Sequence, residues 1–546
     1  MSVAEARFRL GHHSARSYFL ATTDACNAMI TRTSPANEKK PRSLTANVRS
    51  GAIWSISSTM LLRLGSIGIT AVVARLIGPH DFGVFAVATT VFTIVSAFGE
   101  FGVTSCLARA DLDVDALAPT LWTVSLVSTL IMAGLTYKFA LPIAANLGSP
   151  DATQPVRVMA LVLVIYGVSA VPTAQCVREF RQGTLFLANA VGFIPSMAVL
   201  LILAAHGNGA MAFAWSRVVG QTLSCIVILL SVPKIHLPGM ARSALSVLLK
   251  FGVPLACANF VGYILQNVDY ALIGRYIGPV MLGTYVIAFN AASWSSVLLA
   301  GALNTVSMPA FSRVKHDVVK LRGAMADSVR LVALIAGPMC ALVMVLARPI
   351  VLTIYGGRWS AAIPVLSILS LYGLISVVGV LFASMLAALG RSKFVLAVQL
   401  IWLAALVPAM IIGVRQHGIV GAAVAHIVII GPIVLPCYLI ALKRATGVRL
   451  RTLATAAFPP LAAAAITAGL AWLAAAQFDR PVVQLLVGLA VGGTLYMALA
   501  LPQLILLAGP ELAARPQVRR LLRGYYKLGR VTGIPIARLP DQWLEL

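Results

Sequence analysis

Fourteen apolar runs, most of them about 20 residues long, constrain this chain more than any other feature. A helix of about 20 residues crosses about 30 Å of hydrocarbon. In lipid the backbone must bond to itself, which a helix achieves within one segment. The runs lack the alternation of apolar and polar residues typical of barrel strands, so we expect helices. The candidate spans cover residues 51–74, 82–106, 117–138, 156–177, 185–205, 210–232, 246–273, 282–308, 327–353, 362–388, 394–414, 418–441, 453–476 and 482–508.

The charged residues fit a membrane protein. Only 11% of the 546 residues are charged, against about a quarter in soluble proteins, and 59% are hydrophobic. The net charge of +25 could suggest nucleic acid as a partner, but the basic residues sit in short loops between apolar runs, so we expect no nucleic acid. Of the 42 lysines and arginines, 32 fall in the two tails and one alternate set of loops, and 8 fall in the opposite set. The positive-inside rule therefore predicts a bacterial inner-membrane protein with both termini in the cytoplasm.

An internal repeat divides the spans into two blocks. Residues 75–79 (RLIGP) match residues 275–279 (RYIGP), and Gly83 and Gly283 follow at the same offset of 200 residues. This offset covers six spans, so both copies share one orientation, as in transporters built from parallel repeats. We predict an all-α protein with a disordered cytoplasmic tail (1–48), an N-lobe of helices 1–6 (49–240), a C-lobe of helices 7–12 (241–445), helices 13–14 (446–510) and a cytoplasmic C-terminal tail (511–546).

Sites for metals and nucleotides are not expected. The seven cysteines are scattered singly, mostly in apolar segments, without the spacing of a metal site or a disulfide framework. No GxxxxGK[ST] phosphate loop occurs in the sequence. We therefore predict no cofactor, no metal and no catalytic residue, so the chain is expected to be a transporter rather than an enzyme.

A series of short motifs resembles a known family. The motifs are residues 74–83 (ARLIGPHDFG), 98–102 (FGEFG), 274–279 (GRYIGP), 308–313 (MPAFSR), 355–359 (YGGRW) and 362–366 (AIPVL). In this order, over about residues 45–510, the chain resembles the Wzx-type polysaccharide flippases, particularly the colanic-acid-exporter-like branch. These flippases belong to the multidrug/oligosaccharidyl-lipid/polysaccharide exporter superfamily.

The resemblance implies a fold, a substrate and partners. It implies two six-helix lobes around a V-shaped central cavity, and alternating access to that cavity. The implied substrate is an undecaprenyl-pyrophosphate-linked oligosaccharide, moved from the cytoplasmic to the periplasmic leaflet for surface polysaccharide such as O-antigen or exopolysaccharide. Expected partners are this lipid-linked oligosaccharide, the lipid bilayer and a polysaccharide polymerase or export complex, and we expect the chain to work as a monomer.

Two arginines within predicted spans are candidates for binding the anionic head group. Arg63 lies in the first span and Arg217 in the sixth. A charge at the centre of a bilayer is costly, so it usually faces a cavity or a partner. The planar guanidinium forms several charge-assisted hydrogen bonds with phosphate groups. Gln221 lies four residues after Arg217 on the same helical face. A structural ion pair or snorkelling to the lipid head groups is the alternative role for both arginines.

A polar stripe marks the seventh span. Asn259, Tyr263, Gln266 and Tyr270 recur at spacings of 4, 3 and 4 residues, which places them on one helical face. Asn290 belongs to a similar set in the eighth span. Amide and aromatic side chains suit sugar hydroxyls, so we regard these residues as candidates for substrate binding. Hydrogen bonding between helices explains the stripe equally well.

The remaining candidates concern gating and ion pairing. Asp269 is an acidic residue deep in the seventh span, and either pairs with Arg275 or a first-lobe arginine, or exchanges protons in a coupled cycle. Glu100 is expected to be an interfacial or gating residue. Arg75 and Arg275 occupy equivalent loops and either form part of a gate or cap neighbouring helices. His426 is expected to be a packing histidine.

Three other functions compete with the flippase, and the third of them is a non-transporting assembly scaffold, in which the cavity arginines would matter little. An ion-coupled small-molecule or multidrug antiporter of the same superfamily usually has twelve spans and acidic cavity residues, whereas this chain shows fourteen spans and a mainly cationic set. A polytopic glycosyltransferase or polymerase needs acidic catalytic groups or a large periplasmic loop with catalytic residues. Every predicted periplasmic loop here is short, which disfavours that class.

Overall fold

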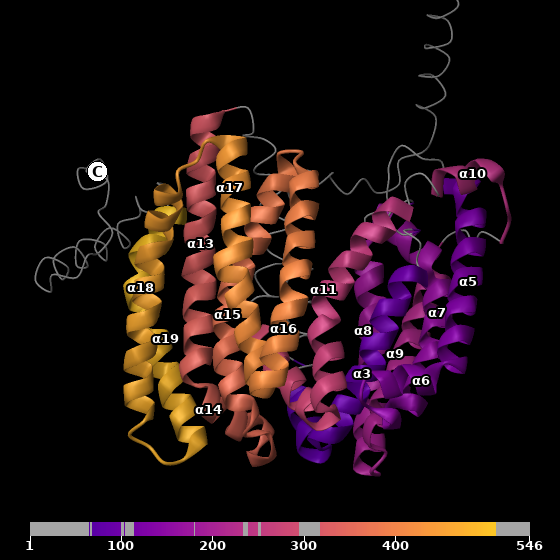
Figure 1. The fold of residues 1–546 in the computed structure, drawn as a ribbon, viewed down its shortest axis with the longest axis horizontal. Helices are drawn as coiled ribbons and strands as arrows, with labels where there is room; N and C mark the ends of the chain where they lie inside the picture. Colours follow the sequence, from indigo (N-terminus) through magenta and orange to yellow (C-terminus); the bar gives the residue numbers. More distant parts are fainter. Residues whose placement is uncertain are drawn as a thin grey trace, which may run out of the picture. The chain divides into compact units, whose positions relative to one another are not determined.

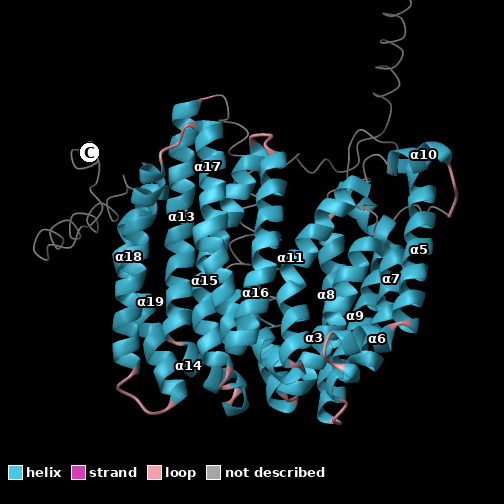
Figure 2. Cartoon of the chain, viewed as in Figure 1, coloured by secondary structure: helices cyan, strands magenta, loops and turns pink. Residues whose placement is uncertain are grey.

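The computed structural model describes residues 68–99, 114–179, 181–232, 238–248, 253–293 and 317–508, with the single positions 65, 103 and 107. All regular secondary structure in this part of the chain is helical, as Figures 1 and 2 show. Both predicted tails, 1–48 and 511–546, lie outside the described residues. Figure 1 gives the labels used below.

The helices agree with the apolar runs. A helical stretch over 68–76 precedes α3, and an apolar helix, Pro279–Ser293, follows α11. The labelled helices are α3 (Pro79–Gly99), α5 (Val114–Lys138), α6 (Ala140–Asn146), η1 (Pro150–Ala152), α7 (Thr153–Arg178), α8 (Gln182–Ala205), α9 (Gly209–Ser231), α10 (Arg242–Val247), α11 (Val253–Ile277), α13 (Val318–Val345), α14 (Ala347–Ile350), η3 (Val351–Tyr355), η4 (Gly357–Trp359), α15 (Ala362–Ala388), α16 (Ser392–Ile429), η5 (Ile430–Val434), α17 (Leu435–Thr446), α18 (Leu450–Ala475) and α19 (Pro481–Ala508).

Ten helices in the described ranges are long and apolar enough to cross a membrane. The chain is therefore an all-α, multi-pass membrane protein, as predicted. The number of fourteen spans remains a prediction, because most of the first span and the end of the eighth lie outside the described residues. The division into two lobes around a V-shaped cavity also remains a prediction.

The predicted eleventh span and the first part of the twelfth form one element, α16, with a break in its middle, and the twelfth span continues through η5 into α17. His417 and Gly418 have non-helical backbone angles, and Gly418 has a φ of +59°, which favours glycine. On either side of this break, Gly413 and Gly421 lie so close that a Cβ on Gly421 would fall 1.9 Å from the Gly413 carbonyl oxygen. The chain therefore turns sharply at the position where the sequence predicts a boundary.

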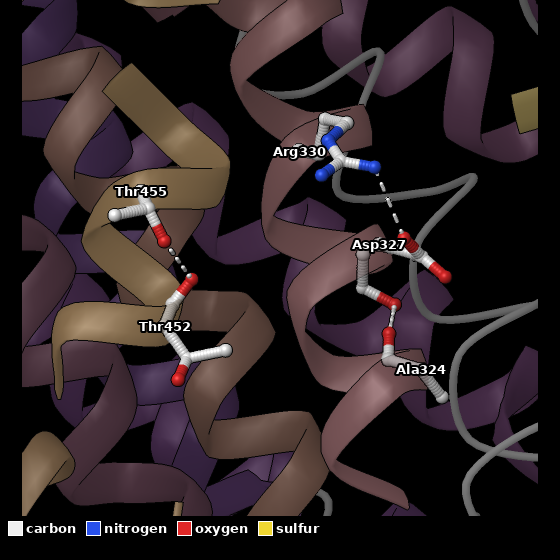
Figure 3. Close-up of polar contacts among 6 residues, drawn as sticks. Ala324, Asp327, Arg330, Thr452 and Thr455 are labelled. Atoms are coloured by element: carbon white, nitrogen blue, oxygen red, sulfur yellow. Dashed lines mark hydrogen bonds and ion pairs between the residues drawn. The ribbon is translucent and has the colours of Figure 1, made fainter. Parts of the chain in front are cut away.

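The last two long helices pack beside α13. Tyr496 of α19 donates its hydroxyl to the Leu334 carbonyl of α13, at 2.8 Å. A Cβ added to Gly337 of α13 would lie 3.2 Å from a methyl group of Leu461 on α18, which shows how closely these helices approach. Polar groups nearby bond within their own helices, as Arg330 does to Asp327 in Figure 3. Apolar packing therefore provides most of the contact between α13 and α18.

The two copies of the repeat pack against each other reciprocally. A Cβ on Gly83 would lie 1.7 Å from the carbonyl oxygen of Pro279. A Cβ on Gly283 would lie 2.0 Å from the carbonyl oxygen of Pro79. Each glycine is the fifth residue of the helix that begins at the proline of its copy, and only a residue without a side chain allows this approach. The offset of 200 residues between the two copies thus corresponds to a contact between equivalent backbones.

Each copy also bonds to the other half of the chain. Arg75 donates to the carbonyls of Thr353 and Ile354 in η3 (3.2 Å from Nε to the Ile354 oxygen). Arg275 donates to the carbonyl of Asn146 at the end of α6, at 3.4 Å. Both arginines therefore bond to main-chain carbonyls in short helical segments, in the manner of a C-terminal cap.

Trp359 strengthens the contact of the first copy. Its side chain is fully buried, and its indole Nε1 donates to the carbonyl of Ala74 at 3.0 Å. Its ring meets Phe82 edge-to-face, with 5.2 Å between the centroids. The YGGRW motif is thus bonded to the segment before α3, although 285 residues separate the two partners in the chain.

Candidate substrate-binding site

The first cavity surrounds Arg217. It has a volume of about 500 Å³ and is lined by α8, α9, the start of α3 and the preceding helical stretch. Its polar lining consists of one arginine with amide and hydroxyl side chains: Thr70, Asn189, Ser196, Ser216, Arg217, Gln221 and Ser224. Beside the cavity, small residues allow α8 and α9 to approach closely, because a Cβ on Gly192 would lie 2.5 Å from the Gly220 carbonyl oxygen.

Arg217 gives this cavity its positive charge. Its side chain is exposed into the cavity, and its guanidinium carbon lies 6.0 Å from the centre of the Phe92 ring. The lining residues include no aspartate or glutamate, and no ion pair of Arg217 is present in the described ranges. Gln221 lines the same cavity one turn later, as the spacing of four residues predicts. An uncompensated guanidinium beside amides and hydroxyls is suited to bind an anion.

A second cavity lies between α11, α15 and α16. It has a volume of about 800 Å³. Aromatic, amide and hydroxyl groups dominate its lining together with one acid and one histidine: Thr93, Gln266, Asn267, Asp269, Tyr270, Phe289, Ser293, Tyr372, Ser376, Gln399, Trp402 and His426. Its size is within the range of about 300–1,000 Å³ that is usual for small-molecule sites.

Asp269 and His426 face each other at the wall of this cavity. The Asp269 Oδ2 lies 3.6 Å from the His426 Nε2, and both side chains are almost completely buried, at 2% and 3% exposed. Tyr285 donates its hydroxyl to the same carboxylate oxygen at 3.2 Å, and the Tyr270 amide donates to Oδ1 at 2.9 Å. The Tyr372 ring lies 4.5 Å from the imidazole, centre to centre. The carboxylate is thus held in one orientation by groups from three helices.

The pairing partner of Asp269 differs from the expectation. The sequence predicts an ion pair with Arg275 or a first-lobe arginine, or a role in proton exchange, but Arg275 instead donates to the Asn146 carbonyl. Six residues along a helix turn a side chain about 120° away from the first and move it about 9 Å along the axis, which explains why the two do not meet. His426, expected to be a packing histidine, is the group that faces Asp269.

The other predicted residues divide into three sets. Arg63 and Glu100 lie outside the described residues, as does the side chain of Asn259. Gln266 and Tyr270 line the second cavity, whereas Tyr263, on the same predicted stripe, is absent from its lining. Asn290 is exposed and also outside the lining.

Several lining residues were not singled out in the sequence. Asn189 lines the Arg217 cavity, and Gln399 and Trp402 line the second cavity. A lone amide within an apolar run is a usable signal for Asn189 and Gln399, because a polar group in a span usually faces a cavity or another helix. Trp402 gives no such signal, since tryptophan is common in membrane helices. In the described part of the chain, no group of three or more His, Cys, Asp or Glu side chains could hold a metal ion.

Comparison with known proteins defines the family. The family model described as "Polysaccharide biosynthesis protein" matches residues 72–364, which is more than half of the chain. This chain therefore belongs to the polysaccharide biosynthesis protein family. The match confirms the resemblance seen in the motifs, and it includes both copies of the repeat and the YGGRW motif.

Two curated relatives and one solved structure extend this result. The chain is 26% identical over 484 residues to the succinoglycan biosynthesis transport protein ExoT of Rhizobium meliloti (strain 1021), covering 86% of this chain and 94% of ExoT. It is 26% identical over 396 residues to the lipopolysaccharide biosynthesis protein WzxC of Escherichia coli (strain K12), covering 71% and 79%. Its fold is similar to the lipid II flippase MurJ in an inward closed conformation, with a TM-score of 0.68, 16% identity, and coverage of 83% and 100%.

Proposed function

We propose that this protein is a flippase that moves undecaprenyl-pyrophosphate-linked oligosaccharide units from the cytoplasmic to the periplasmic leaflet for surface polysaccharide biosynthesis. The names of the relatives support the polysaccharide part of this proposal, and the MurJ-like fold supports movement of a lipid-linked substrate. The proposal also places the protein in a bacterial inner membrane as a monomer, with both termini in the cytoplasm and a polymerase or export complex downstream.

The Arg217 cavity is the observation that carries the proposal. A lipid-linked sugar can keep its prenyl chain in the bilayer, but its pyrophosphate must cross hydrocarbon, where an unpaired charge is costly. A cationic cavity without a competing carboxylate among its lining residues reduces this cost. Arginine can donate two parallel hydrogen bonds to a phosphate group, whereas lysine acts as a point charge.

The cavity also favours a flippase over the related antiporter. A transporter of cationic small molecules needs an acidic group at its binding site, because the opposite charge offsets the loss of water around the cation. The Arg217 cavity contains the reverse arrangement, with a guanidinium and neutral polar groups, and the acid of the second cavity, Asp269, is already in contact with His426 and Tyr285. The alternative function, an ion-coupled multidrug antiporter, is therefore less well supported.

Substitution of Arg217 tests the proposal. In the native host with the gene deleted, we expect Arg217→Gln to restore little surface polysaccharide and to leave lipid-linked repeat units in the inner leaflet, with normal protein abundance. Arg217→Lys should retain part of the activity, since lysine keeps the positive charge but lacks the two parallel N–H donors of the guanidinium. Arg330→Gln, which alters only an exposed pair with Asp327, is the matched control.

Two results would contradict the proposal. If the full deletion leaves no lipid-linked units at all, the protein acts before translocation. If Arg217→Gln restores polysaccharide as well as the wild type does, the guanidinium has no role in binding the head group.

A further inference from the structure

We propose that the second cavity is a subsite for an uncharged sugar ring of the transported oligosaccharide and that it disfavours acidic sugars. This inference rests on the proposed function and assigns a ligand to a part of the protein distinct from the Arg217 cavity. The two cavities would then divide recognition of one substrate, with the anionic head group in the first and a neutral sugar in the second.

Flat aromatic faces line the second cavity. Tyr270, Phe289, Tyr372 and Trp402 belong to four different helical segments and all contribute to its wall. Tyr270 and Phe289 meet edge-to-face, with 6.0 Å between their centroids, so they hold each other in place. Aromatic rings with polar tips combine an apolar face with hydrogen-bonding groups at the edge. A pyranose ring offers the complementary arrangement, with C–H groups on its faces and hydroxyls around its edge.

Some polar atoms at this wall are without hydrogen bonds in the structure. The indole Nε1 of Trp402 is buried without one, and so are both ring nitrogens of His426, although its Nε2 lies 3.6 Å from the Asp269 carboxylate. The amides of Gln266 and Gln399 line the same space. A buried donor without an acceptor is unfavourable, so these groups indicate a ligand that accepts and donates hydrogen bonds. Sugar hydroxyls do both, whereas a lipid acyl chain does neither.

The charges around the cavity select against an acid. Asp269 and His426 are its ionisable lining groups apart from tyrosines, and no lysine or arginine belongs to the lining. The groups that face Asp269 come from each neighbouring element: Tyr285 from the helix after α11, Tyr372 from α15 and His426 from α16. Since the imidazole can at most balance the carboxylate, no positive charge remains for a uronic acid. Like charges in a site of low dielectric constant repel strongly.

Binding of soluble sugars to the full-length protein in detergent tests the proposal. The probes are cellotriose, which is uncharged, and trigalacturonate, which is acidic and of the same length. Saturation-transfer difference NMR detects ligands with millimolar affinity. We expect a saturation-transfer signal from cellotriose. We expect the dissociation constant of trigalacturonate to be at least about tenfold larger, which is the size of effect that a single unfavourable charge contact would produce.

Substitutions locate the binding. Trp402→Phe removes the unpartnered indole donor and should weaken cellotriose binding several-fold, and Gln399→Leu should do the same without changing an aromatic ring. Trp472→Phe is the matched control, because Trp472 lies on α18 with 54% of its side chain exposed, away from the cavity. Elution volume and melting temperature show whether each variant is folded. If Trp402→Phe does not fold, the binding measured with Gln399→Leu decides the outcome.

The proposal is refuted if both trisaccharides bind equally well, or if neither cavity variant changes cellotriose binding. Its failure is distinguishable from failure of the proposed function. If cellotriose binds as expected but lipid-linked units are never formed in the deletion strain, the sugar subsite is supported and the flippase function is refuted. If the units accumulate as expected but no sugar binds, only the subsite is refuted.

Discussion

Replacing Gly83 by alanine tests the contact between the two copies of the repeat. The new Cβ would lie 1.7 Å from the Pro279 carbonyl oxygen, whereas real Cβ atoms are almost never found closer than 3.0 Å to another heavy atom. The two helix starts would therefore have to separate by about 1.3 Å. No change of side-chain rotamer can relieve this clash, because the backbone fixes the position of the Cβ and the other colliding atom is a main-chain oxygen.

The cost of this separation can be estimated. Overpacking of a well-packed contact typically costs about 1–3 kcal/mol, which changes an equilibrium between two conformations by a factor of about 5 to 150. Gly83→Ala should therefore shift the population away from the conformation seen here. Gly283→Ala should have a similar effect, since its Cβ would lie 2.0 Å from the Pro79 carbonyl oxygen. The double variant should cost less than the sum, because the first substitution already separates the same surfaces.

Distance measurement between the two copies detects the shift. Spin labels at Leu76→Cys and Met281→Cys, both exposed positions, would be introduced after replacement of the seven native cysteines. We expect a longer mean distance, or a second, longer population, in Gly83→Ala than in the parent protein. Gly134→Ala is the control, since a Cβ there would have no neighbour within 4 Å. If Gly83→Ala gives the same distances and the same melting temperature as Gly134→Ala, the reasoning from the reciprocal contact is wrong.

Two further predictions concern stability. Trp359→Phe should lower the free energy of unfolding by about 1–3 kcal/mol, because it removes the hydrogen bond to the Ala74 carbonyl and leaves a small cavity. Thermal unfolding in detergent measures this loss. The control variant Trp472→Phe should show no comparable loss. Asp317 accepts hydrogen bonds from the amides of Val319 and Lys320 at the start of α13, and the Lys320 amide and ammonium hold the pKa of this carboxyl below its usual value. The stability that it contributes is therefore present above about pH 4 and lost as the pH falls through the lower pKa of the folded state; melting curves of Asp317→Asn should be less sensitive to pH in this acidic range than those of the wild type.

Features that depend on the local sequence could be predicted well. The apolar run 362–388 coincides with α15, because span length and helix periodicity are properties of one segment. Arg217 and Gln221 line one cavity because four residues make about one helical turn. The broken element α16 was also anticipated, since glycine and polar residues around 415–418 interrupt two apolar runs.

Features that depend on tertiary packing could not be predicted. Asp269 and His426 are separated by 157 positions, and nothing in either segment indicates that α11 and α16 bring them together. Asn290 has the amide expected of a sugar-binding residue, but packing places it outside the cavity lining. The match between the two copies of the repeat was visible in the sequence, whereas their contact requires the fold, because identical motifs can lie far apart as easily as side by side.

The duplicated contact also has a kinetic consequence. Two equivalent backbone crossings, at Gly83 and Gly283, hold the same pair of segments. If one crossing loosens while the other remains closed, the intact crossing keeps the segments near each other and allows the first to re-form. Complete separation of the two segments then requires both crossings to be lost together, so a separation that begins at one crossing tends to reverse.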